Sequence, residues 1–231
     1  TGGTNCHPDT ALYAIYSRDG IHWSMRQRIT SGFFIEGPRP LSNGRLLLAG
    51  EYVDPNRTTN RMRILTSDDV SGLGTWKEVL ISPPDPAVFG YTEPGLFLAA
   101  KGRQATLLFR NYSGTLFSST STDNASTWTV PEKTEYLDST ARIAAGNLPD
   151  GSAYIINNAS PTRFDRSQLV LGLSRDGILF DRAFLLRSEP TQLRFEGEHK
   201  LDGWQYPHAV SWKRFFYVAY TINKEDVGIT R

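Results

Sequence analysis

The residues best suited to chemistry in this sequence are one carboxylate, two guanidinium groups and one phenol. They are Glu93 in Tyr-Thr-Glu-Pro, Arg110 after Leu-Leu-Phe, Arg166 shortly before an apolar run, and Tyr206 in Gln-Tyr-Pro-His. Arginine presents five N–H donors in a fixed fork and stays charged, so a pair of arginines is suited to binding a carboxylate. A phenol is neutral until a base removes its proton, so an anionic ligand does not repel it. The four groups together indicate a site for an acidic ligand.

Other polar residues also stand near the ends of predicted inner strands. His208 follows Tyr206 by two positions, so on an uninterrupted strand the two side chains face the same side. His208 then serves either as a general acid or base or as a packed histidine. The remaining candidates, which we expect to contact a sugar, are Arg39, Arg142, Tyr91 and Asn158.

Purely structural roles are open for the same residues. Glu93 and Arg110 suit an ordinary ion pair at the rim of the fold, and Arg166 suits a loop arginine beside Arg163. Tyr206 precedes Pro207 and suits a core aromatic.

The elements that must position these residues come from a repeat of about 50 residues. Four segments, near 17–23, 67–76, 121–128 and 174–180, share a Ser-x-Asp start and a closing aromatic residue. Their first serines are 50, 54 and 53 residues apart. Spacing of that size is typical of propeller blades, and four copies in phase make a strong signal.

Each copy lies between two short alternating apolar runs, as expected for a hairpin turn. In such a turn Asp accepts backbone N–H groups, Gly takes the positive φ, and the aromatic residue plugs the blade. These segments resemble Asp-boxes, and we expect them to stabilise the fold without taking part in chemistry.

The strand pattern predicts an all-β fold, a β-propeller of four-stranded antiparallel blades in a single domain over residues 1–231. Full blades are expected at about 30–80, 86–137 and 138–190, with two strands of another blade before them and three strands of another after them. The simplest interpretation is a propeller of about six blades whose N-terminal portion is missing here.

Composition excludes several classes of partner and site. The formal net charge of +1 provides no long-range attraction to nucleic acid, and no apolar run is long enough to span a membrane as a helix. Metal-binding and nucleotide-binding motifs are absent, so no cofactor or metal is expected. Cys6 is the single cysteine and allows no internal disulfide. The family resemblance described below implies a secreted, periplasmic or extracellular protein that binds an acidic glycan, and we expect a monomer.

The order Glu93, Arg110, Arg166, Tyr206 over these repeats resembles the sialidase superfamily. The resemblance implies that Tyr206 is the nucleophile, that Glu93 is its general base, and that Arg110 and Arg166 belong to the arginine cluster that binds the substrate carboxylate. Two family features are missing from this sequence, a Phe/Tyr-Arg-Ile-Pro motif and an Asp acid. Tyr206-Pro-His also replaces the usual Tyr-Ser.

Two alternatives to hydrolysis use the same residues. In a polysaccharide lyase acting on uronic-acid glycans, the arginines neutralise the uronate while His208 or Tyr206 removes the proton at C5. In a non-catalytic carbohydrate-binding propeller, aromatic side chains stack on sugar faces.

Overall fold

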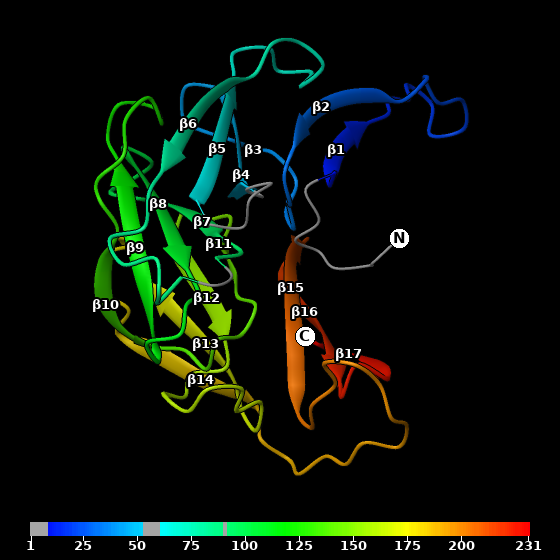
Figure 1. Ribbon diagram of the computed structural model, residues 1–231, viewed down its shortest axis with the longest axis vertical. Coiled ribbons are helices and arrows are strands. Elements are labelled where there is room, and N and C mark those ends of the chain that lie inside the picture. Colours follow the sequence, from blue (N-terminus) through cyan, green and yellow to red (C-terminus); the bar gives the residue numbers. More distant parts are fainter. Residues whose placement is uncertain (1–8, 53–60, 90–91) are drawn as a thin grey trace.

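The fold consists of antiparallel β-sheets. The computed structural model describes residues 9–52, 61–89 and 92–231. All regular secondary structure in these residues is β-strand. These residues contain no helix that is long and apolar enough to cross a membrane. The strands form five sheets that succeed one another in chain order, from blue to red in Figure 1. The predicted all-β class is confirmed.

Three sheets in the middle of the chain have four strands each. The strands of the first are β3 (Arg39–Pro40), β4 (Leu46–Tyr52), β5 (Arg61–Ser67) and β6 (Lys77–Ile81). Those of the second are β7 (Gly95–Ala99), β8 (Gln104–Phe109), β9 (Thr115–Ser121) and β10 (Glu132–Leu137). Those of the third are β11 (Ala144–Asn147), β12 (Ala153–Asn157), β13 (Leu169–Ser174) and β14 (Arg182–Arg187). Neighbouring strands in each sheet are also consecutive in sequence, as in a propeller blade.

The sheets at the two ends of the chain are smaller. The first pairs β1 (Ala11–Ala14) with β2 (Gln27–Ser31). The last contains β15 (Trp204–Trp212), β16 (Phe215–Ile222) and β17 (Asp226–Thr230). The predicted division into three full blades flanked by sheets of two and three strands is therefore confirmed.

The first strands of successive blades lie beside one another. Strand β11 contacts both β7 of the preceding blade and β15 of the following one. Figure 1 shows the sheets following one another around these inner strands, with β9, β10 and β14 farther out. The chain is a β-propeller of four-stranded blades.

Hydrophobic clusters seal the three interfaces between successive blades from β3 to β17. Leu47 and Ile64 pack with Leu107 and Phe109 between the first two full blades, and all four side chains are almost completely buried. A second cluster joins the next pair of blades, and a third includes Trp204 packed on Tyr220 with their ring centroids 5.6 Å apart. Burial of each such side chain contributes about 1.5–3 kcal/mol, so the interfaces rather than isolated blades stabilise the fold.

The repeated Ser-x-Asp segments form the expected turns. In the third full blade, Ser174 Oγ donates to Asp176 at 3.0 Å and accepts the amide of Gly177 at 2.9 Å, where φ is +74°. The same bonds recur in the second full blade, where Ala125 takes the positive-φ position. These hydrogen bonds hold the turns in shape, which is the stabilising role predicted for them.

Two of these turns also contact the preceding blade. The carbonyl of Asp176 accepts the amide of Ala100 at 2.8 Å, and the carbonyl of Asn124 accepts a hydrogen bond from Arg45 at 3.1 Å. The plugging role predicted for the aromatic residue holds for Phe180, which packs on Phe97. It is wrong for Trp23, which is 57% exposed because its sheet has only two strands in which to bury a ring.

Candidate active site

A cavity of about 630 Å³ lies where the inner ends of several blades meet. Glu93, Arg110, Arg166 and Tyr206 all line it. Glu93 comes shortly before β7, Arg110 directly follows β8, Arg166 comes shortly before β13, and Tyr206 lies in β15. Since β7 and β13 start where β8 ends, these positions share one end of the blades, and the repeat brings distant residues together there.

Glu93 and Arg110 form a buried ion pair. The carboxylate Oε2 lies 2.6 Å from Arg110 Nη1, and the two side chains are 6% and 10% exposed. Burial raises the pKa of Glu93, with a smaller contribution from the charge of Glu51, while Arg110 opposes the rise. Glu93 is therefore a stronger base than an exposed carboxylate.

Glu51 in β4 holds the backbone that carries Glu93. Its Oε1 accepts the amide of Glu93 at 2.8 Å, the amide of Thr92 and the Thr92 hydroxyl at 3.0 Å. Glu93 itself has a φ of +30°, a sparsely populated conformation for a residue with a side chain. A carboxylate from the neighbouring blade thus positions the segment, and sequence reasoning missed it.

Neutral groups hold the guanidinium group of Arg166 in place. Its Nη1 donates to Asn158 Oδ1 at 3.4 Å and its Nη2 to the carbonyl of Thr140 at 3.3 Å. Burial, and then the nearby charge of Arg110, lower the pKa of Arg166. Arg110 and Arg166 both line the cavity, and two guanidinium groups there favour an anionic ligand.

Asn158 differs from its predicted role as a sugar contact. It is 1% exposed, and its amide nitrogen donates to the carbonyls of Gln168 at 2.6 Å and Trp204 at 2.9 Å. These bonds and the one from Arg166 occupy the amide group of Asn158, so Asn158 supports the structure around the cavity. Tyr91 lies outside the described residues.

Asp138 is a buried acid that sequence reasoning missed. It is 1% exposed and accepts hydrogen bonds from Asn157 at 3.1 Å and from the amide of Ala141 at 3.2 Å. Burial raises its pKa to about 6, against the opposing effects of these bonds and of Arg110 and Arg166. The arginine pair therefore has a second carboxylate behind it whose charge depends on pH.

Tyr206 lies on a bulge that reorients β15. Gln205 pairs with Thr221 and His208 with Ala219, so Tyr206 and Pro207 together oppose one residue, and φ of Tyr206 is +52°. The bulge breaks the alternation of side chains. The prediction that His208 shares a side with Tyr206 is wrong for this reason, and His208 is not among the described residues that line the cavity.

His208 instead joins a second polar cluster with two of the predicted sugar contacts. Its Nε2 lies 2.6 Å from Arg142 Nη2, and Glu36 lies 3.1 Å from Arg142 and 3.2 Å from Arg39. Arg39 also donates to the carbonyls of Leu96 and Ala145. Partial burial and Arg142 lower the pKa of His208. The structure therefore places Arg39, Arg142 and His208 away from the cavity lining.

Several cavity residues carried no clear signal in the sequence. Arg163 lies 4.1 Å above the ring of Tyr112, and Lys224 lies 5.0 Å from the ring centroid of Tyr206. With Arg110 and Arg166 they make four Arg and Lys cations, and Glu93 is the one carboxylate among the described residues that line the cavity. Such a cavity suits an anion that also offers a face for aromatic contact.

No metal-binding cluster accompanies this site. Over residues 9–52, 61–89 and 92–231, no three His, Cys, Asp or Glu side chains are grouped to hold a metal ion.

Comparisons with known proteins agree with this fold. A family model described as BNR repeat-like domain matches residues 3–218. A search of curated proteins found no match. A mutant of NanB sialidase from Streptococcus pneumoniae has a TM-score of 0.67 and 20% identity, covering 91% of this chain and 32% of its own. The microbial sialidase Hz136 (Hadza) has a TM-score of 0.72 and 18% identity, covering 96% of this chain and 45% of its own.

The likeness extends to another class of glycosidase. An α-L-arabinanase from Penicillium chrysogenum has a TM-score of 0.56 and 17% identity, covering 96% of this chain and 70% of its own. The chain spans less than half the length of the two sialidases above. At these identities the likeness establishes the sialidase-like propeller fold and not an activity. Because the family model covers nearly all of its sequence, the chain belongs to the BNR repeat-like domain family.

Proposed function

We propose that this chain provides much of the active site of a sialidase-like glycoside hydrolase that removes a terminal acidic sugar from a glycan. One observation carries the proposal: Glu93, Arg110, Arg166 and Tyr206 line a single cavity in which cations outnumber carboxylates. The sialidases and the arabinanase among the structural neighbours are glycosidases by name, which supports the same class of reaction.

In the proposed reaction the arginines orient the substrate. Arg110 and Arg166 bind the sugar carboxylate, and Arg166 enters the complex already buried and held by Asn158 and Thr140. The carboxylate of the substrate also offsets the mutual repulsion of the two guanidinium groups. In the free protein, burial, and then the charge of Arg110, lower the pKa of Arg166. The two arginines thus favour the binding of an anion.

Tyr206 and Glu93 then carry out the substitution. Glu93 takes the phenol proton, the Tyr206 oxygen forms a bond to the anomeric carbon, and the bond from that carbon to the leaving oxygen breaks as that oxygen takes a proton from solvent water. A second water then attacks the anomeric carbon and breaks its bond to the Tyr206 oxygen. Glu93 returns its proton to the phenolate, and the proton lost by the attacking water neutralises the hydroxide left by the first step. A tyrosine nucleophile suits an anionic substrate and is a recognised variant among glycosidases. Burial favours the base role because it raises the pKa of Glu93.

The test uses a fluorogenic aryl α-sialoside, whose leaving group departs without protonation. We expect the protein to release the fluorophore, and Tyr206→Phe to lower kcat at least about 100-fold because the nucleophile is lost. Tyr16→Phe, at a 43% exposed tyrosine, is the matched control and should retain activity. Mass spectrometry of the acid-quenched wild-type reaction should find a glycosyl group on Tyr206.

Two results would redirect the proposal. Ultraviolet absorbance from an unsaturated uronate, with no fluorophore release, would indicate the lyase. Binding of acidic glycans without turnover would indicate a carbohydrate-binding propeller. Action outside the cell and a monomeric state remain predictions, to be checked by fractionation of the source organism and by light scattering.

A further inference from the structure

Lys224 is a cation of the cavity that the proposed reaction does not use. It lies in the turn between β16 and β17, and its ammonium nitrogen is 5.0 Å from the centre of the Tyr206 ring. Trp204 at the start of β15 pairs with Ile222 at the end of β16, so this turn lies at the same end of the sheet as Tyr206. The turn therefore brings a cation to the face of the ring whose oxygen is the proposed nucleophile.

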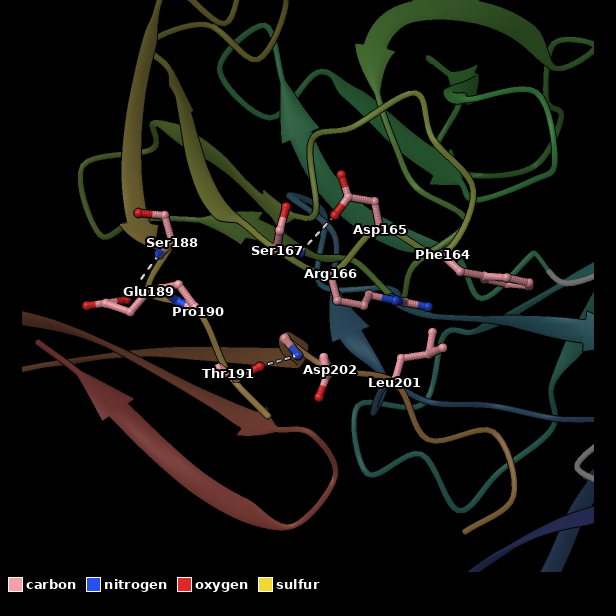
Figure 2. Close-up of a pocket in the computed structure, with 11 residues that line it drawn as sticks. Phe164, Asp165, Arg166, Ser167, Ser188, Glu189, Pro190, Thr191, Leu201 and Asp202 are labelled. Carbon is pink, nitrogen blue, oxygen red and sulfur yellow. Dashed lines mark hydrogen bonds between the residues drawn. The ribbon is translucent and has the colours of Figure 1, made fainter. Parts of the chain in front are cut away.

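The residues on either side of Lys224 fix the turn to the segment between β14 and β15. Asn223 Oδ1 accepts the hydroxyl of Thr191 at 2.7 Å and the amide of Gly203 at 2.8 Å. That amide also donates to the Thr191 oxygen at 2.6 Å, the hydrogen bond drawn at Thr191 in Figure 2. Glu225, whose side chain is 2% exposed, accepts the amide of Phe195 at 2.8 Å. The backbone that carries Lys224 is thus held in place independently of its own side chain.

No ion pair neutralises the charge of Lys224. Its ammonium group donates to the carbonyl of His199 at 2.7 Å. Lys200 binds the Glu225 carboxylate at 2.5 Å, whereas no carboxylate pairs with Lys224 among the residues that the structure describes. A carbonyl oxygen carries only a partial charge, so the ammonium group keeps its net charge beside the phenol ring.

We propose that Lys224 stabilises the Tyr206 phenolate in both steps of the reaction. This inference rests on the proposed function and adds a residue to it. The phenol of the free protein and the aryl ether of the glycosyl-enzyme are uncharged, but the Tyr206 oxygen carries negative charge while its bond to the sugar forms or breaks. A cation beside the ring stabilises that charge more than it stabilises the uncharged ring. Lys224 then acts on the transition states, so its loss lowers kcat and leaves KM little changed.

The first experiment measures kcat and KM for the aryl α-sialoside. Lys224→Met removes the charge and keeps an unbranched side chain, and it should lower kcat about tenfold with KM within about twofold of wild type. Lys224→Arg keeps the charge and should retain most of the activity.

Lys213→Met is the matched control. Lys213 also has a positive φ, of +53°, and it lies 4.3 Å from the ring of Trp212 at the other end of β15. Lys213→Met should therefore have the kcat and KM of wild type.

The second experiment needs no catalysis. Alkaline titration followed by ultraviolet absorbance distinguishes phenolate from phenol, and the part of the signal that is lost in Tyr206→Phe belongs to Tyr206. That part should appear at higher pH in Lys224→Met than in Lys224→Arg, because arginine stays charged throughout the titration.

The two experiments separate failure of this inference from failure of the proposed function. If wild type releases no fluorophore, the proposed function is overturned, and the titration alone decides whether Lys224 stabilises the phenolate. An unchanged kcat in Lys224→Met would overturn the inference, and a raised KM with it would place the ammonium group on the substrate instead. Coincident titrations of Lys224→Met and Lys224→Arg would overturn it as well.

Discussion

Replacing Asp138 by Asn should change how stability depends on pH. Burial raises the pKa of Asp138 to about 6 in the folded protein, against an ordinary aspartate value of 3.8. Between these two values the folded state holds a proton that the unfolded state has lost, so stability falls as pH rises. The difference of roughly two units corresponds to about 3 kcal/mol, lost between about pH 4 and pH 6 and constant above that.

The assay is urea unfolding followed by tryptophan fluorescence from pH 4 to pH 7. The free energy of unfolding of Asp138→Asn, minus that of wild type, should increase by about 3 kcal/mol over this range. If the amide introduced by Asp138→Asn weakens the hydrogen bonds with Asn157 and Ala141, the resulting loss of stability is the same at every pH. It therefore does not affect how the difference in stability changes with pH. Other carboxylates, including Glu93, titrate in both proteins and cancel.

The control is Asp181→Asn, at an exposed position 3.8 Å from Arg182. Its difference from wild type should stay flat with pH. Parallel curves for wild type and Asp138→Asn would refute the reasoning, because they would mean that Asp138 titrates alike in the folded and unfolded chains.

Two further substitutions test the framework. Gly203→Ala should lower both the melting temperature and the affinity for the aryl sialoside, because φ is +111° and a Cβ would lie 2.1 Å from the carbonyl oxygen of Arg166; Gly37→Ala, with nothing within 4 Å, should do neither. An unchanged KM in Gly203→Ala would show that this contact does not position Arg166. Ser174→Ala should cost about 1–3 kcal/mol in urea unfolding, because Asp176 and a buried amide lose their partner, with KM unchanged. A changed KM would contradict the separation of this turn from the site.

The blades could be predicted from sequence because their signals are local. The turn at Ser174, Asp176 and Gly177 is held by bonds among residues within a few positions of one another, so the residue types alone indicate it. The spacing of four such turns then indicates the blade. The meeting of Glu93, Arg110, Arg166 and Tyr206 followed from their common place at strand ends.

The errors arose where the backbone departs from regular geometry. His208 was expected beside Tyr206, but the bulge at Tyr206 and Pro207 shifts the alternation by one residue. A Tyr-Pro pair inside a strand was the available sign, since proline in a strand is typical of bulges.

The remaining omissions depend on contacts between distant residues. Asp138 is far in sequence from both arginines, and its raised pKa comes from burial that only the assembled blades produce. Its one local sign is its position in the segment between β10 and β11, since Glu93 also lies in a segment that leads into the first strand of a blade. Glu51 likewise has no local sign, since its partners belong to the next blade.

The antiparallel order places the repeated turns and the cavity at opposite ends of the strands. Strand β13 starts beside Arg166 and ends at Ser174, and its six residues span about 20 Å. The protein can thus carry a dye, an affinity tag or an inserted peptide at exposed Arg175 without touching the cavity. In a packed layer of molecules immobilised through that end, the cavity of each molecule would face the solution.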